Sequence, residues 1–151
     1  MQQKILGRIC LLLVLLLSSG CEKFKNNPVD VNSTPLVGYW LGEQVTEVEG
    51  AQIYDRALIH VRNDGYLRYT VLSCGNRDGQ LSEKKLALDY MPVTLLTSVK
   101  LILQTYPLTT KYELTLGTWP DQGSGVWEVD TIPLHRIEAD ALPDFEAWHC
   151  E

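Results

Sequence analysis

The sequence predicts an all-β domain that folds as a small up-and-down antiparallel β-barrel of about eight strands. Short runs of alternating apolar and polar residues recur along the chain, turn signals separate them at fairly even spacing, and no stretch shows sustained helical periodicity. A meander of this kind leaves two exposed edges unless the sheet closes, and closure into a barrel removes both. The interior of so small a barrel is either filled by its own side chains or holds one small ligand. The sequence leaves these two interiors open.

The expected strands follow one another from residue 37 to residue 137. They cover residues 37–48, 53–62, 66–73, 81–90, 99–106, 112–118, 125–129 and 132–137. Alternation is clearest in the second strand, where Ala57, Ile59 and Val61 point to one face and the residues between them point to the other. Such alternation is typical of a strand that buries one face against a core.

Turn signals join these strands. Segment 63–65, Asn-Asp-Gly, predicts a hairpin because glycine adopts positive φ without steric cost, and segment 76–79, Asn-Arg-Asp-Gly, repeats the pattern. Segments 107–110 and 121–124 are expected to close two later hairpins. The apolar run 91–96 forms either a covered edge or an exposed patch for a partner, and the sequence does not distinguish these alternatives.

The N-terminus has the features of a secretory signal peptide. Lys4 and Arg8 precede an apolar run over residues 9–17, and the small residues of segment 18–20 follow it. The run is too short to cross a membrane, since a spanning helix needs about 20 apolar residues. We therefore expect residues 1–20 to be a signal peptide that is removed from the mature protein.

Residues 17–21, Leu-Ser-Ser-Gly-Cys, resemble the lipobox of bacterial lipoproteins, although Ser18 stands where that family usually has leucine. The resemblance implies that signal peptidase II cuts between Gly20 and Cys21, and that Cys21 carries acyl chains such as palmitate. Each acyl chain contributes about 0.8 kcal/mol per buried CH₂, so two or three chains hold a domain at a membrane. Because Glu22 rather than aspartate follows the cysteine, the resemblance also implies the outer membrane, with the domain facing the periplasm. An ordinary secretory peptide followed by an unrelated cysteine is the alternative.

Composition divides the rest of the chain into two parts. Residues 21–35 are expected to be the lipidated cysteine and a flexible tether, because polar residues and prolines occur there with almost no apolar periodicity. The β-barrel domain is expected over residues 36–151. Two of the 13 basic residues lie in the signal peptide, which leaves 11 basic against 19 acidic residues. This acidic balance repels nucleic acid, so no nucleic-acid partner is expected.

The cysteines predict one disulfide. Cys10 leaves with the signal peptide and Cys21 is consumed by lipidation, so Cys74 and Cys150 remain to pair in an oxidising periplasm. The pairing would stabilise the fold by about 4 to 5 kcal/mol on the chain-entropy model and hold the C-terminus against the domain. A metal or redox site that includes His149 is the alternative, which the usual need of zinc for three or four closely spaced ligands disfavours.

Two short motifs resemble the lipocalin-like families. Gly38-Tyr39-Trp40 matches their G-x-W signature, and Asp64-Gly65-Tyr66 resembles the D-G-x-Y turn of bacterial lipocalin-like domains. The resemblance implies that Trp40 plugs the closed end of the barrel, that Arg136 packs over it, and that a disulfide joins the C-terminal segment to a strand. A strand that merely begins with a core tryptophan is the alternative. The long helix that lipocalins place after the barrel is not evident in residues 138–151.

The sequence offers no support for catalysis, a metal or a cofactor. Its three histidines, His60, His135 and His149, are scattered, and the chain contains no nucleophile elbow, glycine-rich phosphate loop or H-E-x-x-H motif. We therefore expect a protein that is not an enzyme and that carries no metal and no cofactor.

Three tryptophans are the weak candidates for ligand contact. Trp119 and Trp127 flank the loop 120–125 and could form an aromatic lip, and Trp40 lies at the start of the first strand. A structural role is favoured for the late pair, because aromatic side chains bury large areas and dominate small cores.

The leading hypothesis is a non-catalytic binding module, anchored to the outer membrane through the lipid on Cys21, for an apolar small molecule or an envelope protein. One alternative is a structural or assembly accessory with a filled barrel, and another is an envelope enzyme or an inhibitor of one. An open apolar cavity of about 300 Å³ or more would favour the small-molecule ligand, and a packed interior would favour the accessory.

Overall fold

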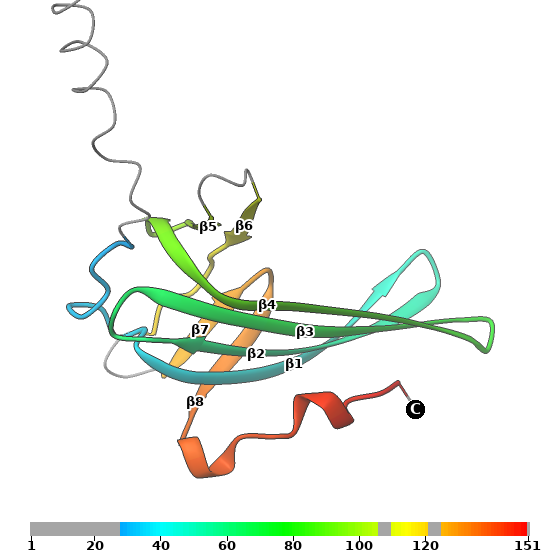
Figure 1. Cartoon of the computed structure of the whole chain (residues 1–151). Helices are drawn as coiled ribbons and strands as arrows, with labels where there is room; N and C mark the ends of the chain where they lie inside the picture. Colours follow the sequence, from blue (N-terminus) through cyan, green and yellow to red (C-terminus); the bar gives the residue numbers. More distant parts are fainter. Residues whose placement is uncertain (1–27, 106–109, 121–124, 151) are drawn as a thin grey trace, which may run out of the picture.

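The computed structural model describes residues 28–105, 110–120 and 125–150. Eight antiparallel strands form one curled sheet in the order β6-β5-β4-β3-β2-β1-β8-β7 (Figure 1). The strands are β1 (Gly38–Val48), β2 (Ala51–Val61), β3 (Tyr66–Arg77), β4 (Gln80–Leu96), β5 (Lys100–Gln104), β6 (Lys111–Thr115), β7 (Val126–Val129) and β8 (Ile132–Ile137), and the 3₁₀ turns η1 (Ala139–Ala141) and η2 (Phe145–Ala147) follow them. The protein is therefore all-β, with the up-and-down antiparallel order that the sequence predicts.

The sheet curls far enough for its two ends to meet. In the sheet order β6 and β7 lie at opposite ends, yet Leu116, directly after β6, forms a bridge with Val129 of β7. The amide of Asp130 also donates a hydrogen bond to the carbonyl of Thr115 at 2.8 Å. These contacts join the two ends along a seam and close the sheet into a barrel-like shape.

Strands β1 to β4 are longer than the barrel and continue beyond it. Within the described residues, β8 pairs with β1 over residues 39–42, and β5 pairs with β4 over residues 93–96. The four long strands then run on together to hairpin tips at Gly50 and Gly79, whose φ values of 77° and 79° suit tight turns. We call this extension, residues 43–55 and 73–85, the distal arm (Figure 1).

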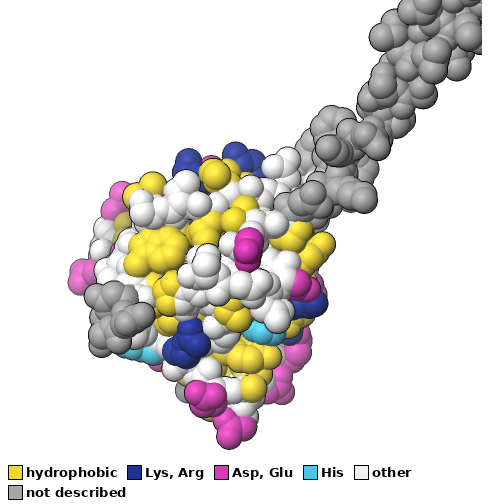
Figure 2. Space-filling model, turned by 90° about the vertical axis from the view of Figure 1, so that its left-hand side faces the viewer, with side chains coloured by type: hydrophobic (Ala, Val, Ile, Leu, Met, Phe, Trp, Pro, Cys, Tyr) yellow, Lys and Arg dark blue, Asp and Glu magenta, His cyan; other side chains and the backbone are white. Residues whose placement is uncertain are grey.

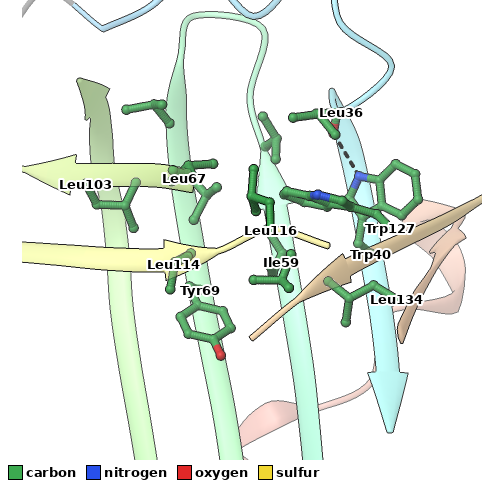
Figure 3. Packing of buried hydrophobic residues seen from close by; sticks show 14 of the residues in the cluster. Leu36, Trp40, Ile59, Leu67, Tyr69, Leu103, Leu114, Leu116, Trp127 and Leu134 are labelled. Atoms are coloured by element: carbon green, nitrogen blue, oxygen red, sulfur yellow. Dashed lines mark hydrogen bonds between the residues drawn. The ribbon is translucent and has the colours of Figure 1, made fainter. Parts of the chain in front are cut away.

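The core fills the part of the barrel around Trp40 (Figure 3). The Trp40 indole donates to the Leu36 carbonyl at 2.7 Å, and its ring lies edge-to-face with Trp127, centroid to centroid 5.6 Å. Ile59 and its neighbours on the same face of β2 are buried in this core, which confirms the predicted alternation. The other buried members are Val31, Leu67, Tyr69, Leu88, Met91, Val93, Leu101, Leu103, Leu114, Leu116, Val129, Ile132 and Leu134. The end that contains Trp40 and the turn 63–65 is therefore packed, and we call it the closed end.

The domain begins earlier in the chain than the sequence predicts. The Val29 amide donates to the Val93 carbonyl at 2.7 Å, and the side chain of Val31 is only 1% exposed within the core. Residues 28–35 therefore pack against the barrel and are not part of a free tether. Isolated valines among polar residues show no periodicity, so only their tertiary contacts identify them. The predicted signal peptide, the cleavage site at Gly20 and the lipid-bearing Cys21 lie outside the described residues.

The predicted turns and strand ends agree with the structure at most positions. Gly65 has a φ of 81° in the turn between β2 and β3, and Gly79 ends the turn between β3 and β4. The apolar run 91–96 is the continuation of β4. Met91 and Val93 are buried, whereas Leu95 is 40% exposed, so the barrel covers only part of the run. Residues 106–109 and 121–124, where two further hairpin turns are expected, lie outside the described residues.

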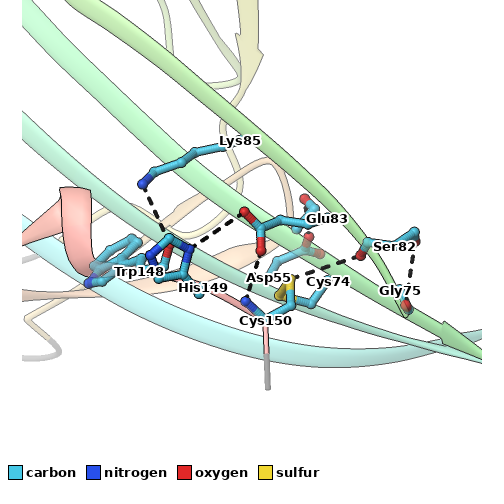
Figure 4. Close-up of a disulfide and its surroundings, with 10 residues drawn as sticks. Asp55, Cys74, Gly75, Ser82, Glu83, Lys85, Trp148, His149 and Cys150 are labelled. Atoms are coloured by element: carbon cyan, nitrogen blue, oxygen red, sulfur yellow. Dashed lines mark hydrogen bonds and ion pairs between the residues drawn. A yellow bond between two sulfur atoms is a disulfide. The ribbon is translucent and has the colours of Figure 1, made fainter. Parts of the chain in front are cut away.

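Residues 138–150, which we call the C-terminal strap, cross the outer face of the sheet. Phe145 and Trp148 are buried there against Leu72 of β3 and its neighbours. Cys150 forms the predicted disulfide with Cys74 of β3, with Cα atoms 5.6 Å apart (Figure 4). The regular structure in the described part of the strap consists of two 3₁₀ turns, which the sequence analysis does not predict. The strap thus adds a second, smaller hydrophobic cluster outside the barrel.

Candidate functional site

The three tryptophans that the sequence offers as weak ligand contacts pack against other parts of the protein. Trp40 and Trp127 are 1% and 0% exposed and pack against each other in the core. Trp119 is half-buried and donates its indole N–H to the Ser98 carbonyl at 2.7 Å. None of the three lines any of the three cavities described below. Trp127 therefore lies in the core, whereas Trp119 is half-buried and packs against the outside of it.

Arg136 lies over Trp40 at the closed end. Its guanidinium carbon is 5.0 Å from the centre of the Trp40 ring, and it donates to the Pro35 carbonyl at 2.5 Å. Gly38 has a φ of 132°, and a Cβ atom built there would lie 3.4 Å from Arg136. Arg136 therefore packs over Trp40 as expected, and its contact with Gly38 was not part of that expectation.

The three histidines lie apart. His60 stacks on Tyr39 with ring centroids 3.9 Å apart, and its Nδ1 is 2.8 Å from the Tyr90 hydroxyl. His149 Nδ1 lies 4.0 Å from a Glu83 carboxylate oxygen, and His135 is exposed on β8. Among the described residues no group of three or more histidine, cysteine or acidic side chains could hold a metal ion.

The electrostatics of His60 follow from its surroundings. Burial lowers the pKa of this imidazole below its ordinary value of 6.5, and the positive charges of Arg62 and Arg68 lower it further. Burial and two neighbouring cations thus both favour the neutral ring. The ring also lines a cavity of about 290 Å³ between the sheet and the strap, together with Tyr90 and Phe145.

The largest described cavity, about 510 Å³, lies on the outer face of the distal arm beside the end of the strap. We call it the distal groove; its walls include Val45, Tyr54, Leu81, Trp148 and His149. The side chains of Val45 and Leu81 are 65% and 54% exposed, which is unusual for aliphatic residues that share one concave surface. The distal groove therefore presents apolar area to solvent.

The charged groups around the distal groove pair with one another. Arg56 lies 2.8 Å from Glu43 and 4.3 Å from the centre of the Trp148 ring. Burial, followed by the Glu43 carboxylate, raises the pKa of the Tyr54 phenol. Arg56 and Glu43 are thus paired with each other, and Arg56 also packs on the Trp148 wall of the groove.

The strap side of the distal groove is held at several points (Figure 4). The Cys150 amide donates to Glu83 at 3.0 Å, next to the disulfide. The Lys85 ammonium donates hydrogen bonds to the Glu146 carbonyl at 3.3 Å and to the Trp148 carbonyl at 3.5 Å. The disulfide and Lys85 together fix the wall that Trp148 forms.

A third cavity, about 300 Å³, opens on the inner face of the sheet where the barrel passes into the distal arm. We call it the barrel mouth; Asp55 of β2, Tyr69 of β3 and Asp130 of the β7–β8 turn line it. Burial raises the pKa of the Asp130 carboxyl, while hydrogen bonds from the Thr115 amide and the Tyr69 hydroxyl oppose that shift. Burial, followed by the charges of Asp130 and Asp55, raises the pKa of the Tyr69 phenol.

Sequence reasoning did not identify the carboxylates of the barrel mouth. Asp55 shares the inward face of β2 with Ala57 and Ile59, so a charged residue on an apolar face was the available signal. Asp130 has a φ of 49° in a turn that contains no glycine, and the sequence alone does not show this.

No helix among the described residues is long and apolar enough to span a membrane. Comparison of the chain with protein-family models, with curated proteins and with solved structures finds no match.

Proposed function

We propose that the protein is a lipoprotein of the bacterial outer membrane that faces the periplasm and serves as a non-catalytic binding module for another envelope protein. The observation that carries this proposal is the packed barrel interior around Trp40 and Trp127. A filled core favours an accessory that uses its outer surface over a calyx for an apolar molecule. The barrel mouth has carboxylates beside its aliphatic side chains, and buried charges without a charged partner suit a neutral apolar ligand poorly.

The position of the N-terminal segment supports a particular orientation. A Cβ atom at Gly65 would lie 2.6 Å from the Cβ of Pro28, so the described chain starts at the turn between β2 and β3. This turn belongs to the closed end, and the tips of the distal arm lie at the other ends of the same strands (Figure 1). A lipid on Cys21 would hold the closed end toward the membrane and direct the distal arm away from it.

Figure 2 shows the surface of the closed end. Hydrophobic side chains there are interspersed with charged and other polar groups (Figure 2). The distal groove, in contrast, combines an exposed valine, an exposed leucine and a buried tryptophan in one concavity. Apolar and aromatic side chains in a concave, rigid surface are the usual anchors of protein–protein interfaces.

Site-specific photocrosslinking in living cells tests the protein partner. A photoreactive residue at Leu81 in the distal groove is expected to give one discrete protein adduct, and the same residue at exposed Asp140 on the strap serves as the control. The captured partner, once purified, should bind the parent protein and not Leu81→Glu. Equal labelling from both positions, or equal binding by the variant, would show that the groove is not the binding surface. If the captured partner is an enzyme whose activity falls when the parent protein is added, the protein is an inhibitor.

Fractionation tests the anchor independently. In the test variant a signal peptide that signal peptidase I removes replaces residues 1–20, and Cys21→Ser removes the thiol that would be acylated, so the protein is expected to move from the membrane fraction to the soluble fraction. Mass spectrometry of the parent protein should show acyl chains on Cys21. If this variant stays in the membrane fraction, or if the parent carries no acyl chains on Cys21, the proposed lipid anchor is wrong, whatever the crosslinking shows.

A further inference from the structure

The inward face of the sheet changes from apolar to polar at one row of residues. The register aligns four polar side chains on β1 to β4, Gln44, Asp55, Ser73 and Lys84. The row one step closer to the core consists of Gly42, Ala57, Val71 and Leu86. The barrel mouth lies where these rows meet. A molecule in this space would touch aliphatic side chains on its inner side and polar groups at the rim.

Three carboxylates line the barrel mouth, those of Asp55, Glu113 and Asp130. Glu113 is already paired with Lys100 at 2.6 Å and with Lys111 at 3.6 Å, which leaves Asp55 and Asp130, from two different elements. Asp55 accepts a hydrogen bond from the Ser73 hydroxyl at 2.6 Å and lies 3.5 Å from the Gln44 amide nitrogen. Asp130 accepts from the Thr115 amide at 2.8 Å. These donors are neutral, and within the described residues neither carboxylate forms an ion pair. Neutral donors hold the carboxylates in place without cancelling their charge, so a cation in the cavity would gain charge-assisted hydrogen bonds.

We propose that the barrel mouth binds an organic cation, a primary ammonium group on an apolar stem. The ammonium would lie against Asp55 and Asp130, and the stem would lie along Leu86, Leu88 and Ile132, which line the inner side. A free alkylamine and a lysine side chain of another protein carry this same chemistry. The site is separate from the distal groove, because the two open on opposite faces of the sheet.

Lys84 is the internal competitor for these carboxylates. It lies at the end of the polar row, lines the same cavity and is exposed, and no ion pair is found for it among the described residues. Its positive charge repels an incoming ammonium group, so replacement by uncharged methionine of similar length should strengthen binding severalfold.

The test uses the chain expressed with its own N-terminal segment, purified and labelled on leucine and isoleucine methyl groups for NMR. Hexylammonium is the probe, and hexanol and hexanoate are controls with the same stem. Hexylammonium is expected to shift the methyl signals of Leu86 and Ile132, while hexanoate leaves them unchanged. Asp55→Asn and Asp130→Asn should each weaken binding on the order of tenfold, since each removes one charge-assisted hydrogen bond.

Asp78→Asn at the tip of the distal arm is the matched control, since it makes the same change of charge outside the cavity. It should bind hexylammonium as the parent does, and Lys84→Met should bind more tightly. A blocked tripeptide with a central lysine distinguishes the sources: tighter binding than hexylammonium indicates a protein side chain, and weaker binding indicates a small amine. The proposal is overturned if hexanol binds as tightly as hexylammonium, or if both aspartate variants bind like the parent. Leu81→Glu should leave this binding intact, which separates it from the distal groove.

Discussion

Asp130 makes two of the hydrogen bonds that join the two ends of the sheet. Its amide donates to the Thr115 carbonyl and its carboxylate accepts from the Thr115 amide, both at 2.8 Å, so one residue forms a two-bond link across the seam. The carboxylate must be partly buried to reach this amide, and burial disfavours its charged form. Asp130 therefore stabilises the seam through geometry while its charge carries a cost.

The raised pKa of Asp130 predicts a dependence of stability on pH. The folded state holds the proton more tightly than the unfolded chain, so the free energy of unfolding falls as pH rises from about 3.8 through the folded pKa. Asp130→Asn keeps an oxygen that accepts from Thr115 and removes the charge. The variant should have a higher Tm than the parent at neutral pH, and the difference should vanish below the ordinary carboxyl pKa. A lower Tm at neutral pH would mean that the charge itself stabilises the seam.

The dependence of stability on pH that His60 predicts has the opposite sign. Its pKa is lowered in the folded state, so the unfolded chain takes up a proton first and stability falls as pH falls from 6.5 through the folded pKa. His60→Phe keeps a ring to stack on Tyr39 and cannot be protonated. Thermal unfolding of both proteins at about pH 7.5 and about pH 5 should show a smaller acid-induced loss for the variant. An equal loss in both would exclude His60 as the group responsible.

At the scale of elements, the contact between β1 and β8 depends on one glycine. Gly42 lies opposite Leu134 in the register, and a Cβ atom built on it would be 2.1 Å from the Pro133 carbonyl oxygen. The absence of a side chain allows the two backbones to approach closely at this point. The pairing of β1 with β8 joins the last hairpin to the rest of the sheet, so this contact is necessary for closure.

Gly42→Ala is therefore expected to lower the free energy of unfolding by about 1 to 3 kcal/mol, because β8 must shift to relieve the clash. Gly75→Ala is the matched control. Its new Cβ atom would meet only the Ser82 hydroxyl oxygen, at 2.6 Å, and that side chain can rotate away. Urea unfolding of both variants measures the difference. Equal destabilisation would show that β8 moves as easily as a serine side chain.

At the scale of the whole molecule, the strap connects the end of the chain to the middle of the sheet. The disulfide spans a sequence separation of 76 residues, and the second hydrophobic cluster forms only when Phe145 and Trp148 lie on the sheet. The strap also supplies one wall of the distal groove. Anchoring of the strap and the shape of the groove are therefore coupled.

Replacement of both Cys74 and Cys150 by serine should reduce stability by about 4 to 5 kcal/mol, since the unfolded chain regains the freedom that the cross-link removes. Hydrogen exchange should show that amides of the strap lose protection before those of β2 and β3. Urea unfolding gives the stability change. If strap and barrel amides lose protection together, the strap is an integral part of the barrel's cooperative unit and not a separate layer on it.

The sequence by itself determined the local features of this protein. Alternation along residues 57–61 identified the inward face of β2, and the glycines at positions 65 and 79 identified two hairpins, because each pattern depends on only a few neighbouring residues. The disulfide followed from counting the cysteines that remain when Cys10 and Cys21 are assigned to the predicted signal peptide and lipid anchor. The predicted lipid anchor on Cys21 also rests on a local motif, and the fractionation experiment tests it.

Only the tertiary structure decided which distant residues meet. It placed Val31 in the core, brought Asp55 and Asp130 to one cavity, and set Leu81 beside Trp148. Each of these meetings depends on sheet register, on the curl that joins the two ends of the sheet, and on the path of the strap. Register, curl and the path of the strap result from contacts between many strands, so no short stretch of sequence encodes them. For the same physical reason the strands could be predicted from the chain, while both candidate binding sites could not.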